Sequence, residues 1–69
     1  MMKNNLREYR KARKITQEQL AQKVNVSRRT IIAIEKGNYN PSLLLALRIC
    51  KELDCHVENV FMLEDKEAQ

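Results

Sequence analysis

Apolar residues recur every three or four positions along most of the chain, which is the spacing of amphipathic helices. Alternation of apolar and polar residues, typical of a half-buried strand, is not evident, and the sequence has no internal repeat. The pattern therefore predicts an all-α fold, a compact bundle of five short helices with little sheet. We expect one domain over residues 1–69, with its core in 5–63 and with residues 66–69 frayed.

The first two helices have clear start signals. Asn4 or Asn5 can cap a first helix that runs to about Lys14. Thr16 and Gln19 have the spacing of a capping box, in which each side chain bonds a backbone amide of the other residue, so a second helix of about eight residues is expected after Thr16. The buried stripe of this helix is expected to consist of Leu20, Ala21 and Val24.

A sharp turn separates the second helix from a third. Asn25 tolerates the left-handed backbone conformation that ends a helix, so the turn is expected there. Ser27 then caps a helix that begins at Arg28, runs to about Lys36 and stops at Gly37, the only glycine of the chain.

A fourth helix is capped by Ser42 and extends to about Asp54. The stripe expected to face the core consists of Leu43, Ala46, Ile49, Cys50 and Leu53. Leu44 and Leu47 lie opposite that stripe, so the helix is apolar almost all round. A short fifth helix is expected to contain Val57, Val60 and Phe61.

The length of the chain restricts its function. A domain of 69 residues buries only a small core, so a deep enzyme pocket is not expected. The longest apolar run, Leu43 to Leu47, is far too short to cross a membrane, and no basic segment followed by an apolar core marks secretion. We therefore expect a cytoplasmic protein that is not an enzyme and has no membrane partner and no small-molecule effector domain.

The two cysteines, Cys50 and Cys55, are expected to be free thiols. Five residues apart on a helix, they would lie about 140° apart around its axis, so a bridge between them is not expected. With His56 they lack the paired spacing of a structural zinc site, and no third residue orients a Cys55–His56 catalytic pair. We expect no metal and no cofactor.

Charge is distributed unevenly along the chain, whose net charge is +4. Residues 1–40 hold ten Lys or Arg against three acidic residues, whereas residues 41–69 hold three against six. A basic N-terminal half suits a polyanionic partner such as nucleic acid, although a merely solvated basic surface would have the same composition.

The second and third expected helices, with the tight turn between them, form a helix-turn-helix arrangement. Ile31 and Ile34 fall on the inner side of the third helix. Its outer side gathers Arg28, Arg29, Ile32, Ala33 and Lys36. Such a face fits the major groove of DNA, where Arg donates two hydrogen bonds to guanine and an apolar side chain contacts the thymine methyl group. Alternatively, Ile32 packs beneath a neighbouring helix.

The stretch from Leu6 to Phe61 resembles the Xre or Cro/CI family of phage-repressor-like helix-turn-helix regulators. The matching positions are the runs Ile15–Ala21, Val24–Ser27 and Asn40–Leu43, together with Ile31, Ile34, Glu35 and Gly37. Two departures are Asn25, where a glycine is common in the turn, and His56, where a Ser or Pro often caps the last helix. The resemblance implies a lambda-repressor-like DNA-binding domain.

The resemblance also implies residue roles. The residues expected at base edges, including Ile32 from the helix wheel, are Ser27, Arg28, Arg29, Ile32 and Ala33. Those expected to contact phosphates are Thr16, Gln17, Lys36, Asn38, Tyr39 and Asn40. Arg10 and Glu35 match an ion pair that ties the first helix to the third, a structural role.

A homodimer is expected, because a small monomer gains nothing from exposing the apolar outer side of the fourth helix, and this agrees with regulators of this kind binding two half-sites about 34 Å apart. The residues expected at its interface are Leu44, Leu47, Phe61, Met62 and Leu63. Alternatively, some of these residues complete a small core. The leading functional hypothesis is a repressor-type, sequence-specific regulator that binds an inverted repeat in double-stranded DNA. The alternative is an antitoxin-like or other protein-interaction module with the same fold.

Overall fold

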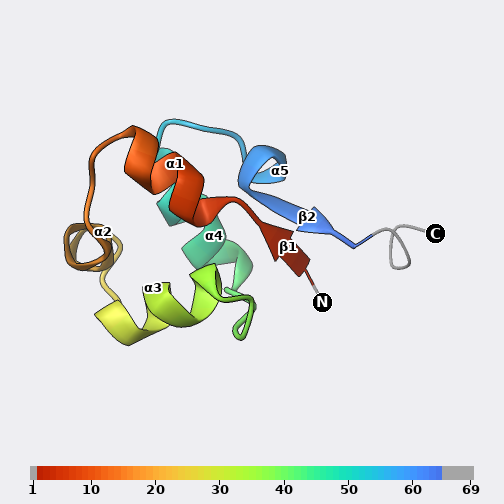
Figure 1. The fold of residues 1–69 in the computed structure, drawn as a ribbon, viewed down its shortest axis with the longest axis horizontal. Coiled ribbons are helices and arrows are strands. Elements are labelled where there is room, and N and C mark those ends of the chain that lie inside the picture. The colour runs from red at the N-terminus through yellow and green to blue at the C-terminus, as the bar shows by residue number, and fades with distance from the viewer. Residues whose placement is uncertain (1, 65–69) are drawn as a thin grey trace.

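A computed structural model describes residues 2–64 of the chain (Figure 1). Within that range the helices are α1 (Leu6–Ala12), α2 (Gln17–Lys23), α3 (Arg28–Glu35), α4 (Leu43–Glu52) and α5 (Val57–Val60). Two short strands, β1 (Met2–Asn4) and β2 (Phe61–Leu63), pair antiparallel with Asn4 opposite Phe61. The five expected helices are confirmed, but the fold is not strictly all-α. The expected fraying of residues 66–69 lies outside the described residues.

The expected helix starts are confirmed for α2, α3 and α4. Thr16 Oγ1 accepts from the Gln19 amide at 3.0 Å, and Gln19 Oε1 accepts from the Thr16 amide at 2.9 Å, which completes the capping box. Ser27 accepts from the Thr30 amide at 3.3 Å, and Ser42 accepts from the Leu45 amide at 3.1 Å. Each cap contributes about 1 kcal/mol to the free energy of unfolding.

Left-handed residues end the helices where the sequence indicates. Asn25 has a φ of 60° and Gly37 a φ of 80°, as expected after α2 and α3. Lys14 also has a positive φ, of 57°, so α1 ends at Ala12 rather than at Lys14. At the start of α1 the N-cap residue is Asn5, but its side chain makes no capping hydrogen bond, and Asn4 Oδ1 accepts from the Leu6 amide at 3.2 Å.

The core lies where the four longer helices meet α5 and β2. Its fully buried large side chains are Leu6, Leu20, Val24, Ile31, Ile34, Ile49, Leu53 and Val60. Leu43, expected on the inner stripe of α4, is 72% exposed, so that expectation is wrong. The inner stripe runs from Leu45 and Ala46 to Ile49 and Leu53, because this spacing keeps one face of the helix turned inward.

Phe61 also differs from expectation. It lies in β2 rather than in a fifth helix, and it is 7% exposed within the core of a single chain. Pairing with Asn4 fixes this strand, so the ring fills the monomer and is not free to form a dimer interface. Figure 1 shows the two strands at the opposite end of the molecule from α2. No described helix is long and apolar enough to span a bilayer.

Candidate nucleic-acid interface

A buried ion pair fixes α1 against α3. Arg10 Nε lies 2.7 Å from Glu35 Oε2, and a second Arg10 nitrogen donates to Glu35 Oε1 at 3.3 Å. The two side chains are 10% and 6% exposed, and Arg10 also donates to the Ile15 carbonyl at 2.9 Å. The pair therefore ties both helices to the segment that leads into α2.

Gln17 extends this network to the start of α3. Its Nε2 donates to Glu35 Oε1 at 3.1 Å, and its Oε1 accepts from Arg28 Nε at 3.4 Å. Arg10, Glu35, Gln17 and Arg28 thus form a continuous chain of polar contacts from the interior to the surface. The side chain of Gln17, expected at a phosphate, lies mainly against other protein groups, which leaves one amide hydrogen for a ligand.

The outer face of α3 lies opposite its anchored residues. Ile31 and Ile34 are fully buried, whereas Arg28 and Arg29 are exposed. Ala33 and Ile32 are half-buried on the outer side. A helix held by two buried isoleucines presents both guanidinium groups with little freedom to roll about its axis.

Ser27, expected at a base edge, serves α3 itself. It is exposed, but its hydroxyl caps the helix at the Thr30 amide and lies 3.1 Å from the Thr30 hydroxyl. A base contact from Ser27 would therefore compete with a local hydrogen bond.

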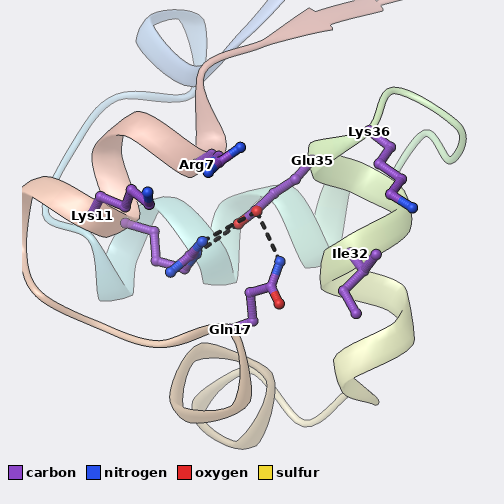
Figure 2. Close-up of a pocket in the computed structure, with 7 residues that line it drawn as sticks. Arg7, Lys11, Gln17, Ile32, Glu35 and Lys36 are labelled. Atoms are coloured by element: carbon purple, nitrogen blue, oxygen red, sulfur yellow. Dashed lines mark hydrogen bonds and ion pairs between the residues drawn. The ribbon is translucent and has the colours of Figure 1, made fainter.

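A basic cleft separates α1 from α3 (Figure 2). It has a volume of about 380 Å³ and is lined by Arg7, Arg10, Lys11, Gln17, Ile32, Glu35 and Lys36. Figure 2 shows Arg7 and Lys11 on the α1 side, and Ile32 and Lys36 on the α3 side. Glu35 is neutralised by Arg10, so the cleft has a net positive charge and suits an anion.

Arg7 and Lys11 are site residues that sequence reasoning missed. The signal was present, since they lie three residues before and one residue after Arg10, on the side of α1 that turns toward α3. Ile32 lines this cleft, with its side chain half-buried beside the charged groups.

A second hollow adjoins the first. It has a volume of about 440 Å³ and is lined by Arg10, Thr16, Gln17, Glu18 and Arg28. Both hollows are lined in part by Arg10 of α1 and Gln17 of α2, so they meet near the start of α2. The two hollows and the exposed start of α3 form one contiguous surface.

The remaining expected contact residues follow α3. Lys36, Asn38, Tyr39 and Asn40 are exposed, with Tyr39 at 49%. Gly37 turns the chain so that this segment leaves the C-terminal end of α3 next to the cleft that Lys36 lines.

Four leucines form a separate exposed apolar set. They are Leu43 at 72%, Leu44 at 58%, Leu47 at 49% and Leu63 at 60% exposure. Three of the residues expected at a dimer interface, Leu44, Leu47 and Leu63, are exposed, and a fourth, Met62, is half-buried. Leu43, Leu44 and Leu47 lie within five consecutive residues of α4, so they are a candidate protein-binding surface.

Comparison with known proteins connects this geometry to a family. Residues 6–59 match a family model described as helix-turn-helix. An HTH-type transcriptional regulator of Methanocaldococcus jannaschii is 54% identical over 66 residues, covering 96% of this chain and all of that protein.

Solved structures show the same fold. The restriction-modification controller protein C.AhdI of Aeromonas hydrophila superimposes with a TM-score of 0.73 at 33% identity, over 78% of this chain and 82% of that one. The N-terminal DNA binding domain of SinR from Bacillus subtilis gives a TM-score of 0.70 at 28% identity, over 77% of this chain and 78% of that domain.

Proposed function

We propose that this chain, which belongs to the helix-turn-helix family of Xre and Cro/CI-type transcriptional regulators, binds double-stranded DNA sequence-specifically with α3 in the major groove. Regulators of this family are not enzymes. The observation that carries the proposal is the exposed pair Arg28 and Arg29 on a helix anchored by Ile31 and Ile34. Arg reads guanine by two parallel hydrogen bonds.

Base contacts are proposed for the outer side of α3. Arg28 is the strongest candidate, because Gln17 already holds its Nε and so limits its rotamers before DNA binds. Ser27, Arg29, Ile32 and Ala33 complete the proposed reading surface.

Phosphate contacts are proposed around the cleft. Arg7, Lys11 and Lys36 surround a hollow that is adjacent to α3 and large enough for a phosphate group. Thr16, Asn38, Tyr39 and Asn40 are exposed at the same surface or in the loop after it. Such contacts fix the register of the protein on the duplex without reading its sequence.

A homodimer that represses transcription from an inverted repeat is the finer part of the proposal. Exposed Leu44 and Leu47 on α4, with Leu63 on β2, supply apolar area that a second copy can cover. Two copies related by a two-fold axis would present their α3 helices to half-sites about 34 Å apart.

The same leucines favour a second candidate, an antitoxin-like module that acts mainly by holding a protein partner. The two functions differ in their dependence on salt. DNA binding through several cations loses affinity as salt rises, with a slope of about −0.9 per phosphate neutralised. Binding to an apolar surface does not.

The test is a titration of the chain against a labelled random-sequence duplex at several salt concentrations, with binding monitored by fluorescence anisotropy. We expect a steep negative slope of log K against log salt, and Lys36→Ala should make this slope less negative. Lys51→Ala, on the exposed side of α4, is the matched control and should leave the slope unchanged. Absence of salt-dependent binding would reject the DNA function in favour of the protein-partner function.

A further inference from the structure

The two cysteines meet at the C-terminal end of α4. This helix ends at Glu52, and Asp54 adopts a left-handed conformation with a φ of 52°. The chain folds back at this point, so the Cys55 amide donates to the Cys50 carbonyl oxygen at 3.0 Å. The expected separation of about 140° around one helix does not hold, because Cys55 is no longer part of the helix.

The Cys55 thiol also lies close to Cys50. Cys55 Sγ donates to the Cys50 carbonyl oxygen at 3.8 Å. Burial, followed by the charge and the hydrogen bond of Cys55 and then the charge of Glu58, raises the pKa of the Cys50 thiol to about 12. Cys50 is 3% exposed whereas Cys55 is half-buried, so an external reagent reaches Cys55 first.

We propose that Cys50 and Cys55 are a redox-modification site that a small neutral or cationic disulfide converts into an intramolecular Cys50–Cys55 disulfide. The adjacency of the two residues across the left-handed turn carries this proposal. It is independent of the proposed DNA binding, because neither cysteine lines the cleft or the outer face of α3.

The reaction proceeds by two thiol–disulfide exchanges. Cys55 loses its proton to solvent and its sulfur attacks the small disulfide, whose S–S bond breaks and releases one small thiolate. Cys50 then gives up its proton and attacks Cys55 Sγ, which breaks the mixed disulfide and releases the second small thiolate. Both thiolates take up the protons lost by the cysteines. Two protein thiols are thereby oxidised, and one small disulfide is reduced to two thiols.

The first step favours the second. Once Cys55 is bound in the mixed disulfide it has no thiolate charge, which removes one cause of the raised pKa of Cys50. The choice of reagent follows from the nearby carboxylates. Glu58 acts on Cys50 through its charge, and exposed Asp54 precedes Cys55, so an anionic disulfide is repelled.

The experiment treats the folded, reduced chain with cystamine, a cationic disulfide, and follows its intact mass. We expect the loss of two hydrogen atoms, no retained half-cystamine, no reaction with iodoacetamide in urea, and an unchanged circular dichroism spectrum. Oxidised glutathione, which is anionic, should react about tenfold more slowly. Dithiothreitol should restore both thiols.

Two variants separate the roles of the cysteines. Cys50→Ala should retain one half-cystamine on Cys55, and Cys55→Ala should stay unmodified while folded. Cys50→Val, which keeps more of the buried volume, replaces the alanine variant if its circular dichroism shows loss of the fold. The proposal is overturned if the wild-type chain accumulates mixed disulfides, if it stays reduced, or if the bridge forms only in urea.

Discussion

Gln17 of α2 donates a hydrogen bond to Glu35 of α3 at 3.1 Å, and the same amide group accepts one from Arg28 at 3.4 Å. The buried ion pair of Arg10 and Glu35 is therefore linked by one side chain to the first residue of the proposed recognition helix. The Gln17 side chain is therefore placed to orient Arg28, and only one of its amide hydrogens remains for a phosphate contact.

Replacing Gln17 is expected to weaken base reading by Arg28. Arg28→Ala should cost about 1 to 3 kcal/mol in binding to the preferred operator and relax specificity at one base pair. Gln17→Ala should cost less at the same base pair, and the double variant should cost little more than Arg28→Ala because the two residues act as a unit. Binding to the operator and to its single-base variants measures this.

The control for that series is Gln22→Ala, an exposed residue of the same helix, which should leave specificity unchanged. Additive effects of Gln17→Ala and Arg28→Ala would show that Gln17 acts on DNA independently.

Loss of Glu35 is expected to destabilise the fold. Glu35→Ala leaves the buried guanidinium of Arg10 without its carboxylate, so the free energy of unfolding should fall by about 3 to 5 kcal/mol. Urea denaturation followed by circular dichroism measures the change. Glu18→Ala, at an exposed acidic residue of α2, is the control. A midpoint equal to that of the wild-type chain would show that the ion pair has no structural role.

Arg7 and Lys11 are expected to contribute to affinity without contributing to specificity. Replacing both with Ala should make the slope of log K against log salt less negative by about 0.9 for each phosphate that the protein no longer neutralises. Affinity should fall equally on operator and random duplexes. Arg48→Ala with Lys51→Ala, both exposed on α4, is the charge-matched control. If both double variants make the slope less negative by the same amount, the cleft has no special part in DNA binding.

The exposed leucines of α4 are expected to hold a dimer together. Leu44→Lys with Leu47→Lys should convert a wild-type dimer into a monomer in sedimentation velocity, because the charges oppose burial of that face. Ala12→Lys, at an exposed residue of α1, should remain dimeric. A wild-type chain that sediments as a monomer at micromolar concentration would contradict the dimer.

The helices could be predicted from sequence because local chemistry determines their ends. Thr16 with Gln19 specifies a capping box, and Asn25 and Gly37 favour the positive φ that terminates α2 and α3. Ile31 and Ile34 determine which side of α3 turns inward. These signals involve residues that are close together in the sequence.

The features that sequence reasoning missed depend on distant residues. The strand at Met2–Asn4 is too short to show a period, and it forms because it meets Phe61–Leu63 at the other end of the chain. The same pairing draws Phe61 into the core. Leu43 was misplaced because α4 is apolar on both sides, so its pattern alone does not identify the inner stripe.

The candidate site shows the same division. The positions of Arg28 and Arg29 follow from the helical wheel of α3. The cleft that Arg7 and Lys11 form with Lys36 requires the packing of α1 against α3, and the link from Gln17 to Glu35 requires the packing of α2 against α3.

Sequence-specific DNA binding by α3 is tested most directly by selecting bound duplexes from a random DNA library at about 150 mM salt, where specific and non-specific affinities typically differ by a factor of about 10³ or more. We expect an enriched inverted repeat whose half-sites lie about one helical turn apart, with Arg28→Ala losing preference at one position in each half-site. A pool that shows no enriched sequence after repeated rounds would contradict sequence-specific DNA binding by this chain.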